Sequence, residues 1–188
     1  MKYIKTTLKL FAILMVVVGV IYPVAVTVLA QLIFPKEAGG SLLYDPGGNI
    51  TGSALIGQPF SDPKYFWSRP SATSGYPYNP LASGGSNLGP TNKDLIDQIS
   101  NRTDLLNSSG IQPPIPSDLV EASASGLDPH ISMQSVLLQI PRVAKARNLE
   151  YETLRKLVLE HVEERQFGFL GEQRINVLEL NLALDSMK

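Results

Sequence analysis

The residues best suited to hold a ligand lie in a glycine-rich segment, Ser83-Gly84-Gly85-Ser86-Asn87-Leu88-Gly89-Pro90. Consecutive small residues can turn several backbone N–H groups toward one anion. Gly84 and Gly89 have the spacing of a phosphate-binding loop, but Pro90-Thr91 stands where such a loop requires lysine followed by serine or threonine. The segment therefore cannot form a complete ATP-hydrolysing site, and a structural turn is the competing interpretation.

Two serines, an aspartate and a histidine occur together a little further along the chain. A hydrolase would use Ser123 or Ser125 as nucleophile and His130 as base. However, Asp128 and Pro129 suit the cap and first position of a helix, which gives the aspartate a structural role. No Gly-x-Ser-x-Gly motif is present. We therefore predict no catalytic residue in this chain.

Metal and thiol chemistry also find little support. The sequence has two histidines, far apart, and no cysteine, which excludes disulfides, thiolate ligands and thiol nucleophiles. A third group of interest is basic and falls in a helical region. Arg142 and Arg147, with the nearby Lys145, Arg155 and Lys156, indicate either solvated helix faces or a surface that docks an acidic partner.

The elements that carry these residues follow a long apolar segment. Leu10 to Phe34 is 25 residues without a charge, and as a helix it spans roughly 37 Å, enough to cross a bilayer. Lys2, Lys5 and Lys9 precede it, and every acidic residue follows it. This asymmetry predicts a cytoplasmic N-terminus (1–9), one transmembrane helix (10–34) and an extracytoplasmic domain (35–188). A cleaved signal peptide ending at Ala30 is the alternative.

Residues 36–188 predict one compact α+β domain. They carry 13 Lys and Arg against 17 Asp and Glu, a net charge of −4, which gives no electrostatic footprint for nucleic acid. Hydrophobic patterns and turn signals predict strands and helices along the domain. The expected strands are 42–44, 54–56, 65–67 and 178–184; the expected helices are 91–106, 128–147 with a kink or break at Pro141, and 151–164.

A long loop, residues 68–90, separates the first strands from the helices. It contains four prolines and four glycines, and a structureless loop of this length in a compact domain is usually functional or disordered. Tyrosine and arginine are common anchors of interfaces. Arg69, Tyr76, Tyr78 and Asn79 therefore predict that this loop binds a partner.

Seven segments, in order along the chain, resemble one family. They are Gly52–Gln58, Tyr65–Ala72, Tyr78–Pro80, Ser83–Pro90, Ser125–Ile131, Gln139–Arg147 and Asn176–Asp185. Together with the N-terminal anchor they resemble KdpC, the C subunit of the bacterial Kdp potassium-transporting ATPase. The resemblance implies a single-pass protein of the bacterial inner membrane. It also implies three partners: a channel-like potassium-binding subunit, a P-type ATPase subunit and a small single-helix subunit.

The same resemblance implies a role as a catalytic chaperone that raises the ATP affinity of the pump subunit, without hydrolysis by this chain. The glycine loop has been likened to the Leu-Ser-Gly-Gly-Gln signature of ABC ATPases, here Ala82 to Ser86, so ATP is the implied cofactor. The implied contact residues are Ser83, Gly84, Gly85, Ser86 and Asn87. Two mechanisms stay open: contact with nucleotide or the nucleotide-bound pump, and an external clamp that assembles the complex. A free-standing envelope hydrolase or ligand-binding domain is the alternative function.

Overall fold

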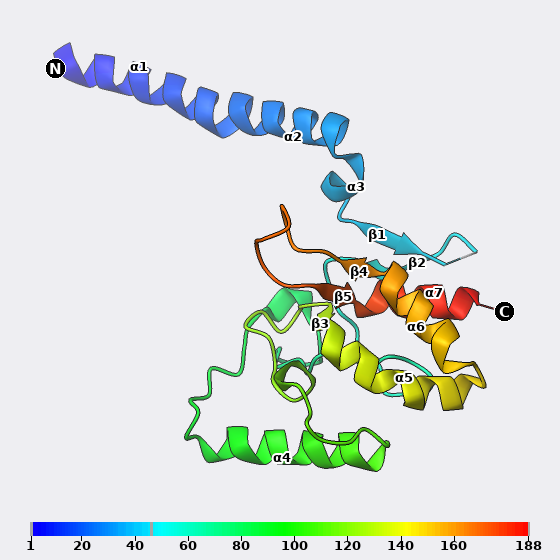
Figure 1. The fold of residues 1–188 in the computed structure, drawn as a ribbon. Helices are drawn as coiled ribbons and strands as arrows, with labels where there is room; N and C mark the ends of the chain where they lie inside the picture. The colour runs from blue at the N-terminus through cyan, green and yellow to red at the C-terminus, as the bar shows by residue number, and fades with distance from the viewer. Residues whose placement is uncertain (1, 46, 188) are drawn as a thin grey trace. The chain divides into compact units, whose positions relative to one another are not determined.

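The computed structural model describes residues 2–45 and 47–187 (Figure 1). The chain divides after Leu42 into two compact units. The N-terminal unit is helical, and the second unit combines helices with short strands, which confirms the α+β prediction.

The N-terminal unit contains one helix long and apolar enough, by length and composition, to cross a membrane. It runs from Tyr3 to Ile33 and comprises α1 (Lys2–Val16), the π-helical turn η1 (Val17–Ile21) and α2 (Tyr22–Ile33). Pro23 has no N–H to donate four residues back, so the hydrogen-bond register shifts at this point. Tyr22 donates instead to the Val17 carbonyl, five residues back. A short helix, α3 (Pro35–Ala38), follows.

The second unit is organised around a three-stranded antiparallel sheet of order β3-β5-β4, made of β3 (His130–Ser132), β5 (Arg174–Asn176) and β4 (Val162–Glu163). Helix α5 (Met133–Arg147) continues from β3, and α7 (Val177–Ser186) continues from β5 (Figure 1). Helix α6 (Tyr151–Glu160) packs against both α5 and α7. Apolar side chains from these elements form the main core, among them Ile131, Val136, Ile140, Val143, Leu154, Val158, Ile175, Leu180 and Leu184.

A smaller core lies beneath α4 (Lys93–Ser108). It joins Leu106 of that helix to Ile111, Leu119 and Val120 in the following loop, which contains the 3-10 turn η3 (Ser117–Leu119). Asn92 caps α4 by accepting the Asp94 N–H, as a helix beginning near residue 91 requires. A two-stranded sheet, β1 (Leu42–Tyr44) with β2 (Ile50–Ser53), and the 3-10 turn η2 (Pro80–Ala82) complete the unit.

The prediction of a strand over residues 178–184 was wrong, because this segment is helix α7. Alternating leucines satisfied the period of a strand, but Val177, Leu180, Asn181 and Leu184 also have helical spacing, and all four are buried. Asn176 caps the helix by accepting the N–H groups of Leu178 and Glu179.

The predicted helix start at Asp128 was also wrong. Residues 130–132 form β3, and α5 begins one residue later with Ser132 as its cap, accepting the Ser135 N–H. Asp128 instead accepts the N–H of His130, two residues on, in a local turn. Pro141 lies inside α5, which runs through it without division.

The prediction of a strand over residues 65–67 was wrong. The segment lies between α5 and α7 and is hydrogen-bonded to side chains of both helices. Two amide side chains supply the hydrogen bonds that a neighbouring strand would have supplied. Asn181 accepts the Phe66 N–H and donates to the Phe66 carbonyl, each at 2.9 Å. Gln139 accepts the Trp67 N–H at 2.7 Å and donates to the Trp67 carbonyl at 3.2 Å. Two smaller differences concern residues 54–56, which lie beyond β2, and α6, which ends at Glu160.

Candidate functional site

The glycine loop lies against the segment 123–126. The Gly84 N–H donates to the Ser125 carbonyl at 2.9 Å, and the Ser83 hydroxyl donates to the same oxygen at 3.1 Å. A Cβ on Gly85 would come within 3.1 Å of the Ala124 carbonyl, so a larger residue there would press on the backbone. Part of the loop is therefore engaged in holding the domain together.

A cleft of about 720 Å³ opens beside this loop, and its lining includes Ser86, Asp94, Asp97 and Arg102. The Arg102 guanidinium donates to the Val120 carbonyl and to Gln98, so it is already bound within the domain. Two carboxylates facing the cleft oppose a triphosphate electrostatically. ATP binding by Ser83, Gly84, Gly85, Ser86 and Asn87 stays a prediction, and this setting does not strengthen it.

The residues predicted to bind a partner fall into two groups. Tyr76 is exposed, and Arg69 and Asn79 are partly exposed. Tyr78, in contrast, is only 6% exposed, donates its hydroxyl to the Arg69 carbonyl and has a positive φ of 59°. Burial raises its pKa to about 12. This placement indicates that Tyr78 packs the domain against itself rather than against a partner.

The two arginines of α5 are also engaged within the domain. Arg142, 9% exposed, donates to the carbonyls of Pro63 and Tyr65 and stacks over the Trp67 ring at 4.1 Å. Arg147 donates to the Lys64 carbonyl and pairs with Asp185 at 2.6 Å. Both side chains therefore fasten the 63–67 segment to α5, and their role as partner contacts stays unsupported by their geometry.

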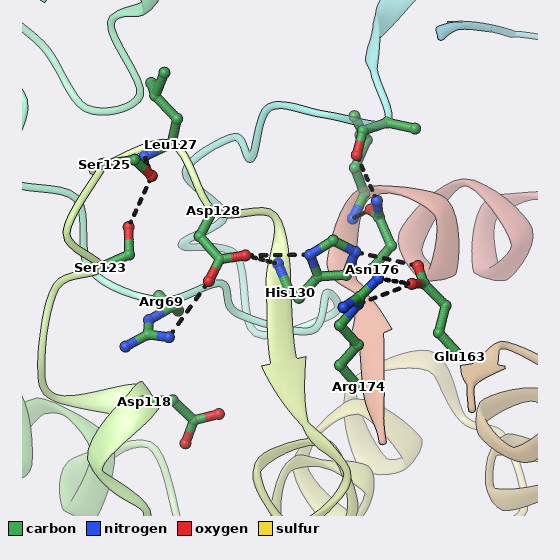
Figure 2. A network of polar contacts seen from close by, with 12 residues as sticks. Arg69, Asp118, Ser123, Ser125, Leu127, Asp128, His130, Glu163, Arg174 and Asn176 are labelled. Carbon is green, nitrogen blue, oxygen red and sulfur yellow. Dashed lines mark hydrogen bonds and ion pairs between the residues drawn. The ribbon is translucent and has the colours of Figure 1, made fainter. Parts of the chain in front are cut away.

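One extended polar cluster was not predicted from the sequence (Figure 2). It is a chain of alternating charges, Arg69–Asp128–His130–Glu163–Arg174, which we call the charge chain. Its successive links measure 3.4, 3.1, 3.1 and 2.9 Å. It joins side chains from β3, β4 and β5 and ties the sheet to Arg69 at the beginning of the 68–90 loop. It also borders a cleft of about 570 Å³ that Asp118 and Gln134 help to line.

Electrostatics in the charge chain favour a protonated imidazole. Burial by itself would lower the pKa of His130, but its hydrogen bond to Asp128 and the negative charge of Glu163 outweigh burial and raise that pKa. Burial likewise opposes ionisation of Asp128, yet the hydrogen bonds from His130 hold the Asp128 pKa below its ordinary value. The members of the charge chain are therefore paired with one another as ions.

The cluster does not assemble a serine hydrolase site. Both ring nitrogens of His130 contact carboxylates, Asp128 on one side and Glu163 on the other. Ser123 and Ser125 lie beyond Asp128 in Figure 2 and accept the backbone N–H groups of Gly126 and Leu127. No serine hydroxyl of this group is paired with the histidine. Across residues 2–45 and 47–187, no group of three or more His, Cys, Asp or Glu side chains is placed to hold a metal ion.

Glu163 and Arg174 could not have been found from local sequence. Glu163 is 33 residues from His130 and lies in a segment predicted as helix. The meeting of the three side chains depends on the register His130↔Asn176 and Val162↔Ile175, which only the folded sheet defines.

The charge chain predicts a pH dependence of stability that His130→Gln should remove. A raised His130 pKa gives stability that is fully present below the ordinary value of 6.5 and is lost as the pH rises through the folded-state pKa. The lowered Asp128 pKa gives stability that is present above 3.8 and is lost as the pH falls through its folded-state pKa.

We therefore expect the difference in unfolding free energy between the parent and His130→Gln to be largest between about pH 4 and 6.5 and to shrink on both sides. Urea unfolding at a series of pH values measures it. His161→Gln is the matched control, because the His161 ring is hydrogen-bonded to the Leu157 carbonyl of α6 and is no part of the charge chain. A difference that does not vary with pH would contradict the raised pKa, because it requires the same His130 pKa in the folded and unfolded states. A parent that loses stability relative to His130→Gln as the pH falls below 6.5 would show an imidazole held neutral in the folded protein.

Fold and site together define a membrane-associated protein with an apolar N-terminal helix and an α+β domain whose charged cluster is paired internally. The family model described as "K+-transporting ATPase, c chain" (KdpC) matches residues 4–186. Proteins named "Potassium-transporting ATPase KdpC subunit" from Geotalea uraniireducens and Geobacter metallireducens are each 55% identical over 187 residues, covering 100% of this chain and 99% of the relative. A protein of the same name from Burkholderia mallei is 53% identical over 178 residues, covering 94% of this chain and 92% of the relative.

The chain belongs to the KdpC family, and it is an accessory subunit of a potassium-transporting ATPase complex.

Proposed function

We propose that this subunit assembles and stabilises the potassium uptake complex from outside the cytoplasm, as a clamp. Its partners are the channel-like potassium-binding subunit, the P-type ATPase subunit and the small single-helix subunit. The proposal depends chiefly on the charge distribution around the apolar helix. Lys2, Lys5 and Lys9 precede its uncharged segment, residues 10–34, and the first acidic residue, Glu37, comes after that segment. This pattern orients the N-terminus toward the cytoplasm and residues 43–188 away from it.

We further propose that the subunit raises the ATP affinity of the pump indirectly, as a catalytic chaperone acting through its partners. An extracytoplasmic domain is separated from cytoplasmic ATP by the membrane. Internal hydrogen bonds of Gly84 and Ser83, and the carboxylates of Asp94 and Asp97 in the adjacent cleft, also weigh against direct binding. A clamp that favours the nucleotide-ready conformation of the pump needs no contact with the nucleotide.

Sidedness in intact cells tests both parts of the proposal. The natural sequence has no cysteine, so single-cysteine variants report on one position each. We expect Ser74→Cys, at an exposed position of the 68–90 loop, to react with a membrane-impermeant maleimide in intact cells. Thr7→Cys, among the lysines that precede the uncharged segment 10–34, should react only after the cells are permeabilised. The reverse pattern would place the domain in the cytoplasm and favour direct nucleotide contact.

A further inference from the structure

The connection between β4 and β5 contains an exposed apolar turn whose side chains are not packed into the domain core. Phe167 is 87% exposed, Phe169 70% and Leu170 47%. We call these three residues the apolar tip. Large apolar side chains grouped at one exposed place, with polar neighbours, mark interaction sites more often than single exposed residues do.

Most backbone N–H groups of the tip are hydrogen-bonded within the turn itself. Gln166 and Leu170 exchange two hydrogen bonds, each at 2.9 Å, and the N–H groups of Gly168 and Phe169 donate to the carbonyls of Arg165 and Gln166. Burying an unpaired backbone N–H is costly, whereas these donors stay satisfied when the tip is covered. The N–H groups of Gln166, Gly168, Phe169 and Leu170 therefore keep their hydrogen bonds when the tip enters an apolar environment.

The tip is also held in one shape. Phe167 and Gly168 have φ angles of 54° and 80°, a left-handed conformation that residues other than glycine rarely adopt. Below it, Gln173 donates to both carboxylate oxygens of Glu164 at 3.0 Å, and Arg174 pairs with Glu163. A turn whose backbone has a defined shape suits a shaped pocket, because less backbone entropy is lost on binding.

We propose that the apolar tip docks into an apolar pocket on a membrane-embedded subunit of the same complex; this rests on the clamp function proposed above. Charge favours a protein pocket over a lipid surface. The segment 163–174 carries three glutamates and two arginines, a net charge of −1, whereas peripheral insertion into anionic membranes depends on basic residues around the apolar group.

Chain length brings such a partner within range. Nine residues, 34–42, separate the end of α2 from the second unit, and a chain of that length reaches at most about 30 Å. The second unit is therefore tethered close to the end of the apolar helix, on the side of the membrane where the extracytoplasmic parts of membrane-embedded partners lie. This confinement raises the effective concentration of the tip for a pocket on those partners.

Cysteine protection in the assembled complex tests the proposal. Phe169→Cys supplies one thiol at the tip, and Leu81→Cys supplies the control, because Leu81 is 92% exposed on the 68–90 loop. Membranes containing this chain alone are compared with membranes containing the whole complex. We expect the maleimide reaction of Phe169→Cys to slow at least tenfold on assembly, and that of Leu81→Cys to stay within twofold.

Each other outcome overturns the proposal in a recognisable way. A Phe169→Cys that reacts equally fast in both preparations shows a free tip. One that is protected in both shows burial in lipid. Equal protection of Leu81→Cys on assembly shows general shielding rather than docking at the tip. If the parent chain itself fails to co-purify with the other subunits, the clamp function fails instead.

A double variant, Phe167→Ser with Phe169→Ser, provides a second measurement. Both side chains are exposed, so the domain should fold, which circular dichroism checks. We expect at least a tenfold loss of the subunit from the detergent-purified complex, with Leu81→Ser retained at the parent level. Normal retention of the folded double variant would overturn the proposal.

Discussion

Replacing Asn181 by leucine is expected to lower the free energy of unfolding by roughly 3–4 kcal/mol. Asn181, 2% exposed, is hydrogen-bonded to both the N–H and the carbonyl of Phe66, which lies in the main core. Leucine has a similar volume but leaves both backbone groups buried and unpaired, at about 1–3 kcal/mol for each group. Urea unfolding of the full chain in detergent, followed by circular dichroism, measures the loss.

Asn101→Leu is the matched control for this change. It makes the same replacement on α4 at an exposed position, where surface substitutions change stability by about 0.5 kcal/mol or less. If Asn181→Leu unfolded at the same urea concentration as the parent, the 65–67 segment would have another source of hydrogen bonds, and the amide pairing would carry little of the stability.

Replacing Arg142 by methionine is expected to destabilise the domain by about 3 kcal/mol, because its charge-assisted hydrogen bonds to Pro63, Tyr65 and Gln139 are lost. Burial lowers the pKa of Arg142 to about 10, but the guanidinium remains protonated at neutral pH. Methionine preserves much of the packing over Trp67 and removes only the charge and the donors. Thermal unfolding by circular dichroism, together with co-purification of the complex, measures the effect.

Lys145→Met makes the corresponding change one turn further along α5, at an exposed position, and should leave stability unchanged. The two readouts separate the roles considered for Arg142. A variant that unfolds more easily but still assembles at low temperature shows a structural arginine. A variant of normal stability that no longer assembles would restore Arg142 as a contact with the partner subunits.

The arrangement around residues 63–67 explains why these two positions are so sensitive. The segment has no strand beside it, so its backbone depends on side chains from α5 and α7. Those helices are separated from it by 72 to 115 residues along the chain. A break in any one contact therefore weakens the junction between the two helices as well as the segment itself.

The sequence by itself determined the apolar helix, the helix over most of residues 91–106, the irregular 68–90 loop and the family. These features depend on composition and order along the chain. A run of 25 uncharged, mostly apolar residues favours a membrane helix whatever the rest of the chain does. The prolines of the loop prevent regular structure locally. The α+β class followed in the same way, since it needs only the presence of both kinds of pattern.

Only the tertiary structure decided the rest. The leucines from 178 to 184 satisfy both a strand and a helix period, and packing against the core selected the helix. Tyr78 has the composition of an interface anchor, but the fold turns its side chain inward. The charge chain joins residues from 69 to 174. Contacts between residues so far apart depend on strand register, which no local sequence pattern predicts.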